Sequence, residues 1–179
     1  MHAAFLPDSE LDQWHDVEVL PIGMPSGDRS VAAQVGVTKD SGSRLRVDIQ
    51  ASAGYSCFQE VRCFKGIAYI GFGQCVFVVH PENRVYEAYP LDGYFGHLCT
   101  AEELEAPSQA FAVLAGSASE LLSFSVNGKL CWRTGNLGID GVIVLAVRDG
   151  VVHGSGEWDP PGGWRPFRLA VDTGEKDAA

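Results

Sequence analysis

The chain has 179 residues, of which 46% are hydrophobic and 20% are charged, a balance typical of a folded globular domain and not of a disordered or membrane-spanning chain. Its 23 acidic and 13 basic side chains give a formal net charge of -10, which repels phosphate backbones and argues against a nucleic-acid partner. No apolar run is long enough to predict a membrane span. We therefore expect one soluble domain over residues 1–179.

The N-terminal residues and the cysteines indicate the compartment. Residues 1–8 lack the basic and apolar regions of a signal or transit peptide. The five cysteines are odd in number and no pair has the spacing of a zinc ribbon, so we expect free thiols in a cytoplasmic protein. The five histidines are never spaced as i and i+4 on a helix. We predict no metal site and no cofactor.

Short β-rich runs follow one another along the chain, separated by Gly, Asn, Asp and Pro. Residues 9–14 are expected to form one or two helical turns before these runs begin. We divide the domain into an N-terminal segment (1–16), a region of β repeats (17–175) and a tail (176–179). The expected strands are 31–37, 45–49, 67–70, 76–79, 85–89, 121–126, 142–147, 151–153 and 167–171.

Three connecting segments have specific signals. Thr100 and Glu103 fit a capping box, which predicts a short helix that Pro107 ends. The segment 108–122 suits either a helix or a strand, and its Phe and Val residues favour a strand. The glycine-rich segment 71–75 is interpreted as a hairpin turn, because no strand-to-helix context supports a phosphate-binding loop.

A weak internal repeat is visible when the runs are aligned on their turns. Four valines each end an apolar run in an Asp, Asn or Gly turn, and their numbers differ by 42, 47 and 45. The turns at Gly66 and Gly150 match each other and are 84 residues apart, about two such periods. This period is the size of a four-stranded propeller blade. The four valines are Val37, Val79, Val126 and Val171.

The turn and strand at 127–133 resemble the D-x-x-G-x-x-x-W-R pattern of quinoprotein-type (PQQ-like) β-propeller repeats, and residues 172–175 are similar to the same turn one repeat later. The resemblance implies architecture only, without a quinone cofactor or dehydrogenase activity. We predict an all-β, mainly antiparallel fold with one or two short helices, arranged as a small or partial propeller-like array of about four repeats. A β-sandwich and a bent open sheet are the alternatives.

The densest polar and aromatic cluster lies at 153–165. Two indoles beside a carboxylate suit a flat or sugar-like ligand, although the indoles equally suit the capping of a sheet. Glu157 and Asp159 would share a face if the strand continued through them, as an acid-base pair requires, but unrelated surface acids explain them too. The candidate binding residues here are Glu157, Trp158, Asp159, Trp164 and Arg165.

Two further loops contribute candidate residues. Tyr94 and His97 come from the loop at 92–97, and Asp140 from the turn at 138–141. In a closed ring of repeats, loops from different units gather at one end, which would unite His97, Asp140 and Glu157 in one site. Cys57 or Cys99 with His97 would form a thiolate pair, but buried inert thiols are the simpler interpretation.

The chain offers aromatic loops but no coherent catalytic constellation. We therefore expect a non-catalytic binding or protein-interaction domain, whose partner is a protein or a small polar ligand. A cytoplasmic immunity or inhibitor protein is one concrete version. The alternatives are a small enzyme that acts on a sugar or other small polar substrate at Trp158 and Trp164, and a structural subunit. The sequence does not set the oligomeric state.

Overall fold

The computed structural model describes residues 1–23, 30–51, 58–107, 110–159 and 162–176. Over these residues the chain forms fifteen strands and one short 3-10 helix, η1 (Asp8–Trp14). The strands are β1 (His2–Phe5), β2 (Glu18–Gly23), β3 (Val31–Thr38), β4 (Arg44–Gln50), β5 (Gln59–Phe64), β6 (Ile67–Phe72), β7 (Cys75–His80), β8 (Val85–Pro90), β9 (Phe95–Thr100), β10 (Val113–Ser117), β11 (Leu121–Phe124), β12 (Leu130–Thr134), β13 (Val142–Arg148), β14 (Val151–Trp158) and β15 (Gly163–Ala170).

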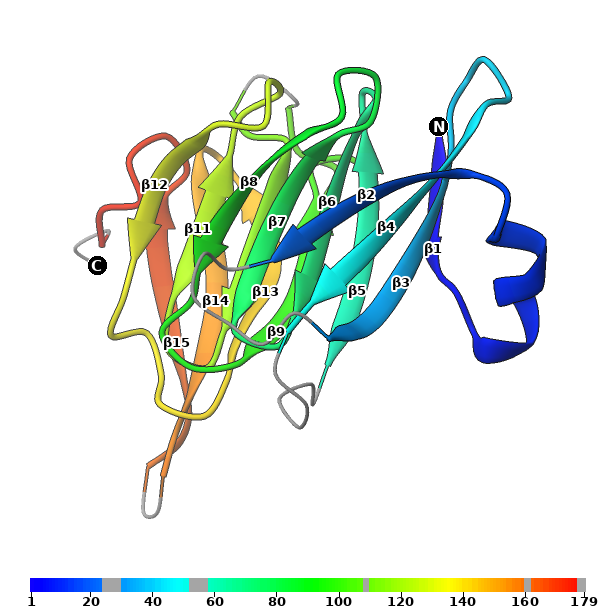
Figure 1. The fold of residues 1–179 in the computed structure, drawn as a ribbon. Coiled ribbons are helices and arrows are strands. Elements are labelled where there is room, and N and C mark those ends of the chain that lie inside the picture. Colours follow the sequence, from blue (N-terminus) through cyan, green and yellow to red (C-terminus); the bar gives the residue numbers. More distant parts are fainter. Residues whose placement is uncertain (24–29, 52–57, 108–109, 160–161, 177–179) are drawn as a thin grey trace.

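The strands form four sheets, which stack in chain order (Figure 1). The first sheet has the order β1-β3-β4-β2, and the second, third and fourth sheets are built from β5 to β8, β9 to β12 and β13 to β15, each strand pairing with the next in the chain. Among these pairs only β2 with β4 is parallel. The first and fourth sheets lie at opposite ends of the stack, so the described residues form an open array. The expected all-β, mainly antiparallel fold with about four units is confirmed.

Three hydrophobic clusters lie between consecutive sheets and join them face to face. The first cluster includes Val47 and Phe77, the second Tyr69 and Phe124, and the third Leu114 and Leu169. The second and third sheets are covered on both faces, so every residue of β6 and of β11 is buried. β14 in the outer fourth sheet alternates instead between buried and partly exposed residues, because only one face of this sheet meets the core.

Each strand that the turn pattern predicts coincides with an observed strand, although several begin or end differently. The segment 71–75 is a hairpin turn, since Phe72 pairs with Cys75. The described part of 108–122 holds β10 and the start of β11, as the strand interpretation predicts. The sequence did not predict β1, β2, β5 or β9, whereas β12 corresponds to the strand in the segment 127–133.

The helix expected after Thr100 is wrong, although its capping hydrogen bonds form. The backbone N–H of Thr100 donates to Glu103 Oε2 at 2.8 Å, and the N–H of Glu103 donates to Thr100 Oγ1 at 3.1 Å. Residues 101–105 make turns and no helix. Glu105 has a φ of 52°, and this left-handed residue ends any helical path and returns the chain to β10, which pairs with β9.

The segment 1–16 is part of the first sheet and partly covers its outer face. β1 pairs with β3, and η1 places the indole of Trp14 on Gly36, where a Cβ atom would lie only 2.5 Å from the ring. The guanidinium of Arg44 lies 3.8 Å above the indole of Trp14. Arg46 donates a hydrogen bond of 3.0 Å to the Trp14 carbonyl. This end of the stack is therefore capped.

Candidate functional site

The segment at 153–165, expected to be a loop, is largely a long β-hairpin. β14 and β15 pair residue by residue from Val151 with Ala170 to Trp158 with Gly163. Glu157 pairs with Trp164, so these two side chains share a face, while the neighbouring Trp158 points to the other face. The two indoles therefore lie on opposite faces of the hairpin and belong to different surfaces.

Glu157 and Asp159 are not held together by one strand. β14 ends at Trp158, and Asp159 lies in the turn that follows, where its carbonyl accepts a hydrogen bond of 2.8 Å from the N–H of Gly162. Glu157 instead lies on the outer face of the fourth sheet. The condition for an acid-base pair, a strand that continues through both residues, is not met.

Four of the expected residues meet at one end of the fourth sheet. The Tyr94 hydroxyl donates to the backbone carbonyl of Asp140 and lies 3.0 Å from its carboxylate Oδ1. The turn that carries Asp140 runs along β14, because the N–H of Glu157 donates to the Gly141 carbonyl at 2.8 Å. A Cβ at Gly141 would lie 3.4 Å from the Trp164 ring.

His97 lies on the first strand of the third sheet, apart from this group. Its Nε2 accepts a hydrogen bond of 3.4 Å from the backbone N–H of Val144 in β13. Burial lowers the pKa of His97 from its ordinary value. Cys99, on the same strand, has its pKa raised to about 11, mainly by burial. The Cys99 thiol is thus protonated at neutral pH and a poor nucleophile, and Cys57 lies outside the described residues.

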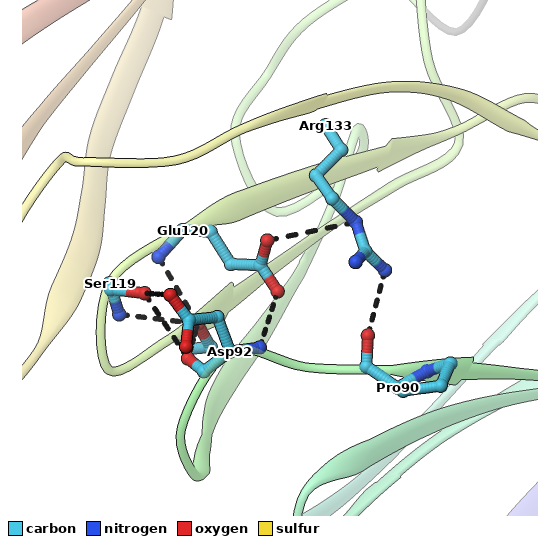
Figure 2. A network of polar contacts seen from close by, with 6 residues as sticks. Pro90, Asp92, Ser119, Glu120 and Arg133 are labelled. Carbon is cyan, nitrogen blue, oxygen red and sulfur yellow. Dashed lines mark hydrogen bonds and ion pairs between the residues drawn. The ribbon is translucent and has the colours of Figure 1, made fainter.

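A buried carboxylate, Glu120, joins the second and third sheets (Figure 2). Its Oε1 accepts the N–H of Asp92 at 2.8 Å, and its Oε2 lies 3.6 Å from Nε of Arg133. Arg133 also donates to the Pro90 carbonyl at 2.8 Å, and Ser119 donates to Asp92 Oδ2 at 2.9 Å. Both oxygens of Glu120 hold protein groups, so this network is structural rather than catalytic.

A cavity with a volume of about 430 Å³ opens beside β15. We call it the β15 pocket. Two aromatic side chains and three cationic side chains line it, together with Asn136, Leu137 and Pro166, and no carboxylate is in its described lining. The aromatic residues are Trp158 and Phe167, and the cations are Arg165, Arg168 and Lys176.

Some cations of the chain are paired with carboxylates. Arg46 pairs with Asp48 at 2.8 Å, and Arg62 pairs with Glu103 at 2.9 Å. In the β15 pocket, the Arg165 guanidinium lies 5.7 Å above the Trp158 ring, and Lys176 Nζ donates to the Asn136 carbonyl at 3.2 Å. Neither Arg165 nor Lys176 forms an ion pair with a carboxylate of the described residues. Among the described residues, these two positive charges therefore have no carboxylate within ion-pair distance.

Sequence reasoning found Trp158 and Arg165 but missed the other wall of the pocket. Lys176 belongs to the segment assigned to a tail, yet it forms a β-bridge with Leu169 and so continues along the edge of β15. Asn136 and Lys176 meet through their hydrogen bond, although no spacing in the sequence links them. Only the tertiary structure brings these residues together.

Comparison with protein-family models, with curated proteins and with solved structures finds no match for this chain. Within the described ranges, no group of three or more His, Cys, Asp or Glu side chains is placed to hold a metal ion. None of the helical structure described is long and apolar enough to cross a membrane.

Proposed function

We propose that this protein is a non-catalytic binding domain that holds a small organic anion with a flat apolar part in the β15 pocket. One observation carries the proposal: Arg165 and Lys176 line a cavity whose described lining has no carboxylate and includes an indole and a phenyl ring. In a chain with a net charge of -10, cations gathered in a concavity favour an anionic occupant.

The chemistry of the lining supports this ligand class. Ligand pockets usually enclose roughly 300–1,000 Å³ and combine apolar walls with a few polar groups. A guanidinium binds a carboxylate or phosphate through two parallel hydrogen bonds, which an ammonium group cannot reproduce. Trp158 and Phe167 add aromatic surface to the lining, against which a ring can pack.

The same lining supports binding without catalysis. A general acid or base must lie within hydrogen-bond reach of the reacting atom. The described lining of the β15 pocket has no carboxylate, imidazole or thiol. Glu157 lies on the outer face of the fourth sheet and Asp159 at the hairpin turn, so neither is part of this lining.

A matched pair of probes tests the proposal. Benzoate and benzamide have nearly the same shape, and only benzoate is charged. We expect benzoate, but not benzamide, to raise the melting temperature, because it binds the native state alone. At ten times its Kd a ligand stabilises by about 1.4 kcal/mol, which corresponds to roughly 3–5 °C for a chain of this size.

Two variants assign the effect to the pocket. Arg165→Gln should remove the benzoate shift, whereas Lys129→Gln, which changes an exposed cation in the third sheet, should keep it. The melting-temperature shift caused by inorganic phosphate, which has no ring, measures the contribution of charge alone. Equal shifts with benzoate and benzamide, no shift with benzoate at any concentration, or a full shift in Arg165→Gln would refute the proposal.

A further inference from the structure

The outer face of the fourth sheet exposes large apolar side chains. Leu145 is 64% exposed, Trp164 48% and Ile143 37%. Ile139, in the adjoining turn, is 49% exposed. The outer face of the first sheet, in contrast, is partly covered by η1, whose buried Trp14 packs against it. One end of the stack is capped, and the other presents apolar side chains to solvent.

The pairing register shows which side chains share this outer face. Directly paired residues point to the same side, and the bulge between Val144 and Ala146 places both Leu145 and Ala146 opposite His153. The face therefore consists of four rows across the strands. In order along the strands, the rows are Arg148, Val151 and Ala170; Leu145, Ala146, His153 and Arg168; Ile143, Ser155 and Pro166; and Gly141, Glu157 and Trp164.

The outer face of one copy is complementary to the same face of a second copy whose strands run in the opposite direction. Arg148 and Arg168 lie in the first two rows, and Glu157 lies in the last, so the arginines and the carboxylate of these rows are at opposite ends. Glu103 and Glu105, from the turn after β9, lie beside the edge of β13 at Arg148. A two-fold axis across the strands sets the first row against the fourth and the second against the third. Leu145 then meets Ile143, and the large Trp164 meets the small Ala170.

We propose that the outer face of the fourth sheet docks a second copy of this chain, in a two-fold symmetric dimer with antiparallel strands across the interface. Such an interface is isologous, so each favourable contact occurs twice. A two-fold axis along the strands would instead set the row of Glu157 against itself. The antiparallel arrangement sets the row of Glu157 against the row of Arg148, so the carboxylate of one copy and the guanidinium of the other lie in facing rows, on neighbouring strands.

The size of the face sets the strength of this dimer. Three strands at a spacing of roughly 4.8 Å, each about eight residues long, cover on the order of 400 Å² per copy. Stable interfaces bury about 800 Å² per partner, and smaller ones are weak or transient. The dimer should therefore form at high concentration and dissociate on dilution.

Sedimentation equilibrium at about 5 to 500 μM tests the proposal. We expect the wild type to associate reversibly and Leu145→Lys to have a dimer Kd at least roughly tenfold higher. The matched control is Val85→Lys on β8, because Val85 is also an exposed aliphatic residue (52%) and lies outside the face. Circular dichroism confirms that each variant folds.

A charge exchange tests the arrangement of the two copies. Arg148→Glu and Glu157→Arg should each weaken the dimer, and the double variant should regain affinity, because it exchanges the ends without changing the pattern. A wild type that stays monomeric at every concentration, or a double variant weaker than both single ones, would overturn the proposal. These variants leave Arg165 and Lys176 intact, so the outcome is separate from that of the β15 pocket.

Discussion

At the scale of single residues, His97 connects the third and fourth sheets through its neutral imidazole. Its Nε2 accepts the N–H of Val144, which requires that this nitrogen carry no proton. Burial is the main cause of its lowered pKa; Glu60 opposes the shift and Arg62 adds to it. The folded protein therefore resists protonation of a side chain that the unfolded chain protonates readily.

This shift gives stability a dependence on pH with a defined sign. Below about pH 6.5 the unfolded chain takes up a proton at this position, while the folded state does so only at lower pH. The free energy of unfolding should thus fall as the pH decreases from 6.5 through the folded pKa, and His97 should contribute no slope above that window. Urea unfolding at pH 7.5 and 5.5 measures the loss.

The His97→Gln variant should lose less stability than the wild type between those two pH values. His15→Gln is the control, because the His15 side chain is 69% exposed and contacts the exposed Asp16 and the Asp12 carbonyl. Equal losses in the wild type and in His97→Gln would contradict this assignment.

The candidate residues show what a sequence gives at this scale. Trp158 and Arg165 are candidates because an indole and a guanidinium beside Pro-Gly turns suit a ligand, and both line the β15 pocket. The separation of Trp158 from Trp164 was not predictable, since it depends on a register in which Glu157 pairs with Trp164. The absence of a carboxylate from the described lining of this pocket is a property of three-dimensional neighbours, which the net charge does not reveal.

At the scale of elements, the turn after β15 packs on the third sheet. Gly174 has a φ of 71°, and a Cβ at this position would lie 2.5 Å from the Trp132 ring. The Trp132 Nε1–H donates to the Val171 carbonyl at 2.9 Å, and Thr134 Oγ1 donates to the Gly174 carbonyl at 2.6 Å. The Trp132 indole of β12 thus connects the third sheet to the turn after β15.

Alanine substitutions at Gly174 and Gly42 should separate the stability cost of a steric clash from that of left-handed backbone strain. Gly42 also has a positive φ, 84°, but nothing lies within 4 Å of its Cβ position. Gly42→Ala should therefore cost about 1 kcal/mol, the left-handed penalty alone. Gly174→Ala should cost about 2–4 kcal/mol, because the methyl group also displaces Trp132. Urea unfolding of both variants measures the difference, and equal costs would contradict the contact.

Turns were more predictable than strands for a physical reason. The pairs Lys65-Gly66 and Asp149-Gly150 both have positive φ at each residue, as the Gly-rich pattern indicates. Strands such as β5 were missed because they mix charged and apolar residues: Glu60 and Arg62 on β5 pair with partners in the third sheet. Their polar character comes from contacts between sheets, which a local pattern cannot show.

At the scale of the whole molecule, the two ends of the stack differ in their covering. The period of the turns predicts the four units, and the composition predicts their β structure. The cap was not predictable, because it requires η1 to fold back so that Trp14 lies on Gly36 and below Arg44. Trp14 lies at the capped end and Trp164 at the open end. The stability costs of replacing them measure the difference in covering.

Trp14→Ala should destabilise the protein by about 3 kcal/mol or more, since it removes an indole that is 8% exposed and uncovers the first sheet. Trp164→Ala deletes the same group from a position that is 48% exposed, and should cost about 1 kcal/mol or less. Unfolding in guanidinium chloride at a low protein concentration measures both. A larger cost for Trp164→Ala would contradict the assignment of the two ends.

The pairing of each strand with its successor in the second, third and fourth sheets has a consequence for how the molecule assembles. Hairpins of this kind close through short loops, and each sheet then depends on its immediate neighbours alone, as in repeat proteins. Order can spread stepwise from one sheet to the next during folding. Amide hydrogen exchange should accordingly be slowest in β6, β7, β10 and β11, whose sheets have neighbours on both sides, and faster toward β15, where the succession stops.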